Sequence, residues 1–576
     1  MDAARQPFAM QRRQFLCRTA IATGLVWASG GCASRAFGGG REIATDIAII
    51  GGGVGGCAAA LAACRAGRRV VLTEETDWIG GQLTSQAVPP DEHPWIEEFG
   101  CTRAYRQFRD GVRARYRSDP ALTPAARAMA QLNPGNGRVS RLCHEPRVAL
   151  AVLEDLLAPH VAAGRLVILR DARPVAADVE GDRIASVTLE VAGDGRVVVT
   201  APWFVDATEL GDLLELARVE HVVGAEGRGE TGEERAPERA NPMDQQAVTW
   251  CFAMEHRKGE DHVGARPERY GHWRDFVPAL TPPWTGKLLS WECTDPIGLG
   301  PRRIGFDPEG GIAGPNLWTY RRLVDARQWA AGSGRADVCL VNWPQNDYLG
   351  GALIGPGVTD AVRRRRLWDA RQLSLCLLHW MQTEAPRPDG GTGWKGLRLR
   401  GDVTGGPDGL AKAVYVRESR RLRAEFTVLE NHVGTDARMK ATGLGKTEVT
   451  AEPFPDSVGV GAYRIDLHPS TSGRNYVDVS SLPFRIPLGA LVPRRVENLL
   501  AGAKNLGTTH LTNGCYRLHP VEWNIGEAAG VAAAFAMERR TTVRAVRAGA
   551  TLLAEFQQRL RDDGFELEWP RNVRPL

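Results

Sequence analysis

The sequence predicts an α/β fold of three layers, in which helices cover a parallel β-sheet. Three stretches of the chain lead to this prediction. Residues 46–74 read as strand, glycine turn, helix and strand; residues 166–200 read as short alternating strands with turns; residues 497–534 read as a buried strand, a glycine loop and an alanine-rich helix. The first and last stretches are expected to build the parallel sheet, and the middle stretch a small β-meander beside it.

The first stretch places a G-x-G-x-x-G spacing directly after a short apolar strand, residues 46–50. Each glycine has a mechanical role: Gly51 allows the tight turn, Gly53 lets the backbone approach a pyrophosphate, and Gly56 lets the helix lie close to the strand. Phosphates are then favoured by the unpaired N–H groups at the positive end of the helix. The pattern predicts a Rossmann-like dinucleotide site.

The residues after the turn support the same site. Residues 57–66 form an alanine- and leucine-rich helix, Gly67 is placed to cap it in the left-handed conformation, and residues 70–72 form a second strand. Glu74 ends that strand, where a carboxylate can accept hydrogen bonds from ribose hydroxyls. A glycine motif alone is weak evidence, but here the strand, the helix and the acid agree.

The first 40 residues are expected to be an export signal and linker. Paired arginines in QRRQFL, residues 11–16, precede a short, mildly apolar stretch, residues 19–28, as in a twin-arginine signal. Cys32 follows in a sequence that resembles a lipoprotein cleavage site, although Ser29 stands where leucine is usual. We therefore expect an exported, periplasmic protein, and leave open whether a lipid on Cys32 anchors it to the membrane.

Charge and cysteine usage exclude two classes of partner. The net charge is only +4 over 576 residues, and the basic residues are scattered, so nucleic acid is not an expected partner. Nine cysteines lie beyond Cys32 with no C-x-x-C spacing among them, so no metal or iron–sulfur site is predicted. Buried free thiols suit a protein that folds in the reducing cytoplasm before export.

The chain is too long for one simple core, so two closely packed domains are expected. We expect an export signal and linker at residues 1–40. A dinucleotide-binding domain would follow in two parts, residues 41–215 and 486–576, with a mixed α+β substrate or cap domain, residues 216–485, inserted between them. Further expectations are helices near residues 147–163, 359–381 and 417–430 and an exposed, charged loop over residues 219–241.

Two further loops are candidates for the same cofactor. A second glycine pair, Gly80 and Gly81, leaves the edge of the predicted strand and could reach the far half of the dinucleotide, although an ordinary turn is the alternative. Residues 203–206 read as a buried strand, and Asp206 would end it beside the cofactor if it belongs to the same sheet.

The ordered motifs resemble the FAD-dependent oxidoreductase family of the glutathione-reductase-like flavoproteins, in particular its xanthan-lyase-like branch. The resemblance covers most of the mature chain, through residues 46–85, DATELGD at 206–212, NWPQNDY at 342–348, RESRR at 417–421, DLHP at 466–469 and residues 493–534. It implies FAD as the cofactor. Broader relatives carry glycine after D-A-T, where this chain has Glu209, so the contact of that residue is in doubt.

The resemblance also implies which residues bind FAD. The ADP half would be held by the glycine turn and Glu74, the flavin side would lie near the second glycine pair, and the start of the C-terminal helix would cradle the isoalloxazine and ribityl end. The cofactor-binding candidates are Gly51, Gly53, Gly55, Gly56, Glu74, Gly80, Gly81, Gln82, Asp206, Gly526, Glu527 and Ala528.

The expected function is oxidation of a small-molecule donor, such as a sugar, polyol or amine, by hydride transfer to flavin N5. A base must accept the donor's proton, and histidine suits this role because its pKa lies near working pH. His510 and His519 lie in the polar loop before a helix expected near Ile525; His93 and His468 are further candidates, and Arg517 could clamp a carboxylate or sugar oxygen. Each of these residues could instead be structural.

The electron acceptor is expected to be a quinone, an electron-transfer protein or oxygen. One dinucleotide fingerprint argues against a dedicated NAD(P)H domain, and NAD(P)H would be scarce outside the cytoplasm. The alternative function is a flavin-containing lyase or isomerase that acts on a glycan without net redox. A glycan-binding protein without enzymatic activity would require a vestigial flavin site, yet every fingerprint glycine is present.

Overall fold

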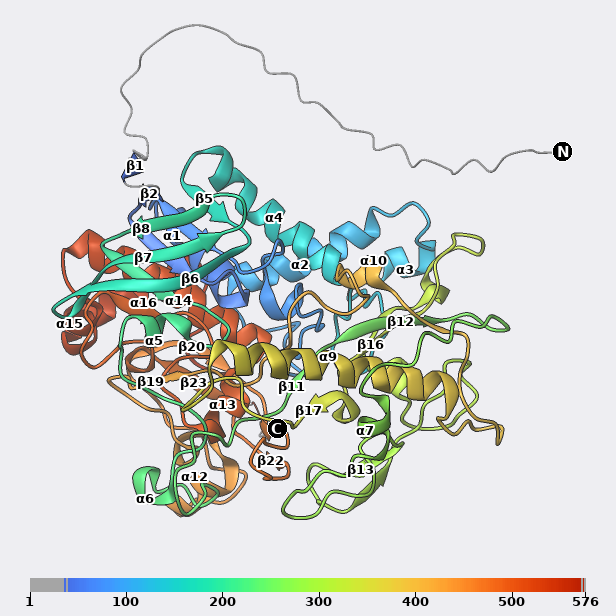
Figure 1. The fold of residues 1–576 in the computed structure, drawn as a ribbon. Coiled ribbons are helices and arrows are strands. Elements are labelled where there is room, and N and C mark those ends of the chain that lie inside the picture. Colours follow the sequence, from blue (N-terminus) through green and yellow to red (C-terminus); the bar gives the residue numbers. More distant parts are fainter. Residues whose placement is uncertain (1–35, 38–39, 571–572, 574–576) are drawn as a thin grey trace, which may run out of the picture.

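The computed structural model describes residues 36–37, 40–570 and 573. The fold is built on a five-stranded parallel sheet, and the α/β fold class is confirmed. Figure 1 shows how the helices and strands are arranged in the chain. Every residue of its β3, β4 and β9 strands is buried, as expected for parallel strands covered on both faces. The strand order is β24 (Leu499–Ala501), β9 (Trp203–Asp206), β3 (Ile47–Ile50), β4 (Val70–Thr73) and β5 (Leu166–Leu169).

Two helices from opposite ends of the chain pack closely beside this sheet. They are α1 (Val54–Arg65) and α14 (His519–Arg539). A Cβ atom added to Gly526 would lie 2.0 Å from the Gly55 carbonyl oxygen, so the two backbones touch directly. The predicted start of α14 near Ile525 is wrong: Pro520 at the first turn allows the helix to begin at His519.

The β-meander predicted at 166–200 is confirmed as a separate sheet from residue 172 onward, but residues 166–169 form β5 at the edge of the parallel sheet instead. β6 (Ala172–Glu180), β7 (Arg183–Val191) and β8 (Gly195–Thr200) pair antiparallel in sequence order. The structure adds β2 (Gly40–Ala44), which runs parallel to β8, and β1 (Ala36–Phe37) at the edge.

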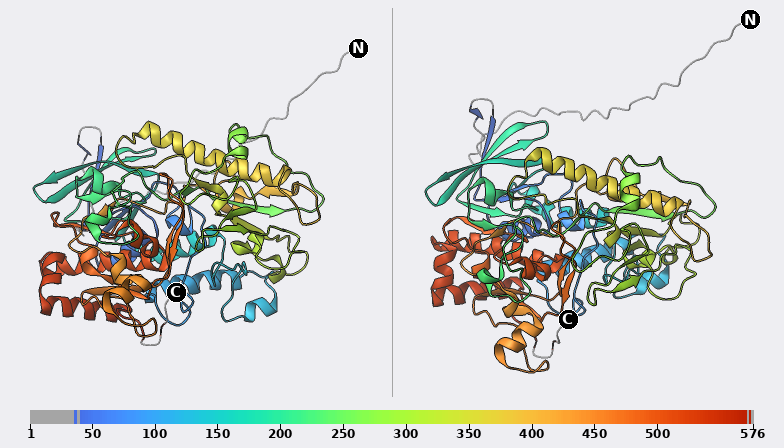
Figure 2. Two further views of the ribbon diagram at one scale, coloured as in Figure 1. Left: turned by 90° about the horizontal axis from the view of Figure 1, so that it is seen from below. Right: turned by 60° about the horizontal axis from the view of Figure 1, so that its bottom comes forward.

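The segment between the two parts of the parallel sheet is mixed in structure. Its largest sheet has the order β15 (Arg322–Val324), β16 (Val338–Val341), β12 (Phe252–His256) and β18 (Leu397–Leu399). The helix predicted at 359–381 is confirmed as α9 (Asp360–Thr383), which runs from the side of the β-meander to the opposite end of the molecule (Figure 2). The helix predicted at 147–163 is confirmed as α4 (Pro146–Ala162).

Two sequence-based expectations in this segment are wrong. Residues 417–430 contain no long helix; β19 (Arg421–Leu422) pairs with β10 (His221–Val222) instead. Residues 219–241 are not simply an exposed loop, because Glu226 and Glu233 are buried and bind protein groups. In both places charged side chains are paired inside the protein.

The remaining elements frame these layers. Helices are α2 (Arg103–Arg117), α3 (Pro124–Ala128), α5 (Asp212–Leu216), α6 (Arg228–Thr231), α7 (Tyr270–Asp275), α8 (Leu317–Tyr320), α10 (Gly401–Thr404), α11 (Glu430–Val433), α12 (Thr435–Thr442), α13 (His510–Tyr516), α15 (Val543–Ala548) and α16 (Ala550–Asp563). Short strands are β11 (Val248–Thr249), β13 (Glu292–Thr294), β14 (Pro301–Arg303), β17 (Asp347–Tyr348), β20 (Ser457–Gly461), β21 (Ile465–Leu467), β22 (Val477–Val479) and β23 (Phe484–Pro487). Among the described residues, no helix combines the length and apolarity that a membrane span requires.

The contact between α1 and α14 generates a test. We expect Gly526→Ala to lower the melting temperature, because its Cβ would meet the Gly55 backbone at 2.0 Å and overpacking costs about 1–3 kcal/mol. Calorimetry should be compared with Gly229→Ala in α6, where an added Cβ meets nothing within 4 Å. The control gains helix propensity without a clash, so a Gly526 variant as stable as the control would contradict this packing.

Candidate functional site

The glycine turn between β3 and α1 has no room for side chains. Gly51 has φ of +103°, and a Cβ there would lie 2.3 Å from the Ala207 backbone. A Cβ on Gly56 would lie 1.9 Å from the Gly51 carbonyl oxygen. Gly53 is the N-cap of α1. The roles predicted for tight turning and close helix packing therefore have a steric basis in the structure.

A cleft opens beside this turn. Its lining includes Glu74, Gly81, Gln86 and Glu209 as well as the turn itself, residues 51–53. The Glu74 carboxylate accepts hydrogen bonds from the backbone N–H and hydroxyl of Thr76, at 3.0 and 2.8 Å. Burial raises the pKa of Glu74 to about 8, although the bonds from Thr76 oppose the rise.

The second glycine pair docks onto the first. Gly80 and Gly81 both have positive φ, and the Gly80 N–H donates to the Gly52 carbonyl at 2.7 Å. The next residue, Gln82, is buried and donates to the Arg517 carbonyl at 3.1 Å and to Glu522 Oε2 at 2.5 Å. This loop therefore connects the glycine turn to the first turn of α14.

Asp206 braces the loop that follows β9. Its carboxylate accepts from the Thr208 N–H and hydroxyl, at 3.0 and 2.7 Å, and from the Leu214 N–H at 3.1 Å. Burial raises the pKa of Asp206 to about 6 against these hydrogen bonds. These bonds hold the loop on which Glu209 lies. Glu209 lines the cleft and Asp206 does not, so Asp206 affects the cleft by holding this loop.

The chemistry of this cleft fits a dinucleotide. Backbone without Cβ atoms lies where phosphates would approach, and Glu74 offers an acceptor at the expected distance along the strand edge. Several buried polar atoms around the turn also lack hydrogen-bond partners in the described structure: both amide atoms of Gln86, Gln82 Oε1, Glu209 Oε1 and Glu522 Oε1. Buried polar atoms are usually paired, so these groups are suited to a polar ligand.

The predicted residues of α14 bind protein groups. Gly526 abuts Gly55, Ala528 is buried, and the Glu527 carboxylate accepts from Thr102 Oγ1 at 2.6 Å and Trp523 Nε1 at 2.9 Å. Glu522, one turn earlier, is the residue of α14 that approaches the glycine turn, at 3.7 Å from an added Gly53 Cβ. Sequence reasoning missed Glu522 and Lys504; a charged residue within an otherwise apolar stretch was the available signal.

Three of the predicted histidines are enclosed. His93 Nε2 contacts the Gly100 carbonyl at 3.0 Å, and His510 Nδ1 lies 3.2 Å from Glu226 Oε2. His519 Nδ1 accepts from the Asp91 N–H at 3.0 Å. Burial lowers the pKa of His93 to about 4 and that of His519 to about 3, which makes both weak bases.

His468 differs from these three. Its side chain is 18% exposed, and its Nδ1 lies 2.5 Å from Asp347 Oδ2. Asp347 is buried and also contacts Thr249 Oγ1 at 2.6 Å and Arg417 Nη2 at 3.0 Å. Burial opposes its ionisation, but Arg417 and His468 lower the pKa of Asp347. The carboxylate therefore orients the imidazole and leaves Nε2 directed elsewhere, 4.0 Å from Asp466 Oδ2.

Arg517 links His468 to the cofactor cleft. Its Nη2 contacts Asp466 Oδ2 at 3.4 Å, its Nη1 donates to the Tyr415 hydroxyl at 3.0 Å, and its carbonyl accepts from Gln82. The buried Arg517 Nε has no partner in the described structure. His468 and the glycine-turn loops are thus joined through Asp466, Arg517 and Gln82, so the structure brings these sequence candidates together.

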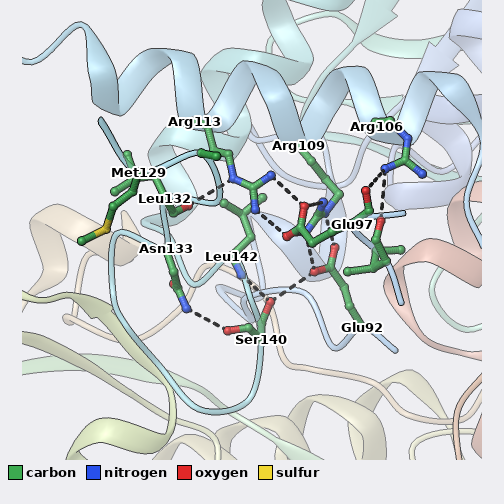
Figure 3. Close-up of polar contacts among 12 residues, drawn as sticks. Glu92, Glu97, Arg106, Arg109, Arg113, Met129, Leu132, Asn133, Ser140 and Leu142 are labelled. Carbon is green, nitrogen blue, oxygen red and sulfur yellow. Dashed lines mark hydrogen bonds and ion pairs between the residues drawn. The ribbon is translucent and has the colours of Figure 1, made fainter. Parts of the chain in front are cut away.

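A buried ion-pair cluster joins α2 to the loop that precedes it, which contains Glu92 and Glu97. Arg109 and Arg113 of α2 point to Glu97, at 2.7 and 2.6 Å, and Arg109 also binds Glu92 at 2.9 Å (Figure 3). The side chains of Arg109 and Glu92 are each 1% exposed. The charged triplet before α2, Asp91, Glu92 and His93, could be expected to face solvent as a helix cap, but its side chains are buried. The neighbouring Asp91 contacts Arg321 Nη1 at 3.2 Å. Asp91 is also one of the charges that raise the pKa of Arg517, so the two charged groups are electrostatically connected.

Comparison with known proteins adds a family match. The model of a family described as FAD dependent oxidoreductase matches residues 46–560. No curated protein sequence matches the chain significantly.

Solved structures show distant likeness. L-proline dehydrogenase from P. horikoshii has a TM-score of 0.16 and 17% identity, over 32% of this chain and 24% of that one. A geranylgeranyl bacteriochlorophyll reductase-like protein from Thermoplasma acidophilum has a TM-score of 0.34 and 10% identity, over 91% of this chain and 85% of that one. Glycerol-3-phosphate dehydrogenase from Bacillus halodurans, complexed with FAD, has a TM-score of 0.21 and 13% identity, over 37% of this chain and 39% of that one. The chain thus spans about a quarter of the first structure's length.

The raised pKa of Glu74 predicts a pH dependence. Between pH 4.5 and about 8 the folded protein retains a proton on Glu74 that the unfolded chain has released. The free energy of unfolding should therefore fall as pH rises through this window, and Glu74→Gln should reduce the slope by up to about 1.4 kcal/mol per pH unit. Urea unfolding of cofactor-free protein at several pH values measures it. Glu180→Gln, an exposed control, should leave the slope unchanged; parallel curves for all three proteins would refute the assignment.

Proposed function

The chain belongs to the FAD-dependent oxidoreductase family, and from that premise we propose that it oxidises an alcohol group of a sugar or polyol. FAD is its cofactor, and the enzyme has a flavin redox role. The observation that carries the proposed reaction is the Asp347–His468 pair, which is joined to the loops of the cofactor cleft through Asp466, Arg517 and Gln82. We infer that the chain belongs to the glutathione-reductase-like, xanthan-lyase-like branch.

The cofactor would be held by the groups around the glycine turn. The backbone of residues 51–53 suits the phosphates, Glu74 suits the ribose, and Gly81 with Gln82 lies toward the ring end. When bound, FAD supplies the acceptor for a hydride. The remaining tasks, donor orientation and removal of its proton, fall to the side chains of this chain.

His468 is proposed as the proton acceptor. Alcohol oxidation removes a proton as well as a hydride, and a neutral imidazole accepts that proton at its unprotonated nitrogen. Because Asp347 contacts Nδ1, the proton of neutral imidazole is held there and the lone pair lies on Nε2. Asp347 also stabilises the imidazolium that results. The deep burial and low pKa of His519 make it a poorer candidate.

The surrounding groups support a neutral, hydroxyl-rich donor. The nearby arginines are already paired, Arg321 with Asp91 and Arg517 with Asp466, so no unbalanced charge calls for an ionised donor. Tyr415 and Tyr463 add phenolic groups close to the same charges. Such a mixture of donors, acceptors and aromatic rings suits sugar hydroxyls and C–H faces better than a carboxylate or an amine.

Location and acceptor follow from the N-terminal motif, which lies outside the described residues. With a twin-arginine signal at 11–16, the enzyme would work in the periplasm, with Cys32 as an optional lipid anchor. A quinone, an electron-transfer protein or oxygen would then take the electrons.

The proposed base has a kinetic test. A donor is first found by anaerobic bleaching of the flavin with sugars, polyols, amines and amino acids. His468→Gln should then slow flavin reduction by that donor about 10²- to 10⁴-fold, because a general base is lost. Asp347→Asn should slow it as well. Stopped-flow rates normalised to bound FAD measure the effect, and reduction by dithionite should be unchanged.

His510→Gln and His519→Gln are the matched controls. A slow rate in a control with a normal rate in His468→Gln would place the base elsewhere. Turnover of a glycan without consumption of any electron acceptor would select the lyase or isomerase function over a net oxidation.

Export has a separate test. Replacing Arg12 and Arg13 with lysine should leave precursor in the cytoplasm, because lysine lacks the planar guanidinium pair that the export receptor is expected to read. Cell fractionation and blotting measure the distribution, with Arg5→Lys as a control outside the pair. Unchanged periplasmic accumulation would remove the argument against NAD(P)H as acceptor.

A further inference from the structure

One lysine next to the cofactor cleft is completely buried. Lys504, three residues after β24, has a fully buried side chain. Its Nζ donates to Glu209 Oε2 and lies 3.7 Å from Glu522 Oε2. Burial alone would lower its pKa, but these two carboxylates raise it, so the ammonium is charged. A buried cation therefore stands beside the glycine turn with two acidic neighbours.

The Glu209 carboxylate occupies space next to the glycines. Its Oε1 would lie 2.9 Å from a Cβ on Gly53 and 2.6 Å from a Cβ on Gly81. The missing side chain of Gly53 is what lets a backbone approach a pyrophosphate. Glu209 Oε1 is buried and has no hydrogen-bond partner in the described structure. One oxygen of this carboxylate is thus bonded to Lys504, while the other points at the glycines without a partner.

A carboxylate in this position conflicts with the cofactor. The FAD pyrophosphate is negatively charged, and Glu209 and Glu522 would repel it at close range in a buried setting. The same ammonium that now satisfies Glu209 is suited to satisfy a phosphate, since Lys is a compact cation with three donors. An exchange of one anion for another at Lys504 removes the repulsion without leaving a buried charge unpaired.

We propose that the Lys504 ammonium is the phosphate receptor of the FAD site, and that the Glu209 carboxylate is an internal surrogate that the pyrophosphate displaces. Glu209 lies on the loop that Asp206 braces, and its side chain is 27% exposed, so the carboxylate has solvent to turn toward. Glu522 is 0% exposed and remains bonded to Gln82, which keeps one counter-ion near Lys504 throughout. This inference rests on the cofactor and is independent of the donor and of His468.

The proposal predicts effects of opposite sign for the two partners. Lys504→Met should weaken FAD binding about 10- to 100-fold, the range for a lost charged hydrogen bond. Glu209→Gln should tighten FAD binding, because it removes the competing charge. If the ion pair were purely structural, both variants would bind FAD more weakly. FAD dissociation from the purified holoprotein, followed by flavin fluorescence, gives both values without any assay of turnover.

Truncated ligands locate the charge. ADP rebinding to protein stripped of flavin should follow FAD, weaker in Lys504→Met and tighter in Glu209→Gln, whereas riboflavin, which lacks phosphate, should respond to neither variant. Lys287→Met, which removes a surface pair with Asp275, is the control and should leave all three ligands unchanged. If Lys504→Met does not fold, the sign of Glu209→Gln decides alone. Weaker FAD binding in Glu209→Gln, or riboflavin binding that falls with ADP, overturns the proposal.

Discussion

The close approach of backbone at the glycine turn is the constraint on which the site depends. Gly51 and Gly56 allow β3 to turn directly into α1, and the contact between Gly55 and Gly526 brings α14 against the same helix. Since none of these positions has room for a side chain, the first turn of α14 is fixed beside the turn. The C-terminal segment therefore brings Glu522 and Arg517 against Gln82, and Arg517 in turn contacts Asp466.

Buried ion pairs fix the loops that this packing leaves irregular. The pairs Arg109–Glu92, Arg417–Asp347 and Arg421–Glu226 each join segments distant in sequence, and all six side chains are at most 7% exposed. Such pairs contribute little net stability, because desolvation offsets the attraction, but removing one partner strands a buried charge. Their effect here is to permit one arrangement of the loops around the cleft rather than several.

Local patterns in the sequence were sufficient for β3, the glycine turn, α1, β4 and α9, because each of these depends on residues close together in the chain. The errors came where charged residues are buried. Residues 219–241 have the composition of an exposed loop, yet Glu226 pairs with Arg421 inside the protein. Residues 417–430 read as a helix, yet Arg421 lies in a short strand. The sequence also could not show that Asp347 lies against His468, 121 residues away in the chain.

The pairing of Lys504 with Glu209 follows from the order of the strands. β24 lies parallel to β9, with Ala501 beside Asp206, and each residue of the pair stands three positions beyond these partners. Because carboxyl ends of adjacent parallel strands meet at one edge of the sheet, the two loops must place these side chains together. Without Lys504, Glu209 would be an unpaired anion beside the glycine turn; without Glu209, Lys504 would keep only Glu522, 3.7 Å away, as a counter-ion. Each residue therefore offsets the charge of the other, beside the glycine turn where we propose that the phosphates of the cofactor are bound.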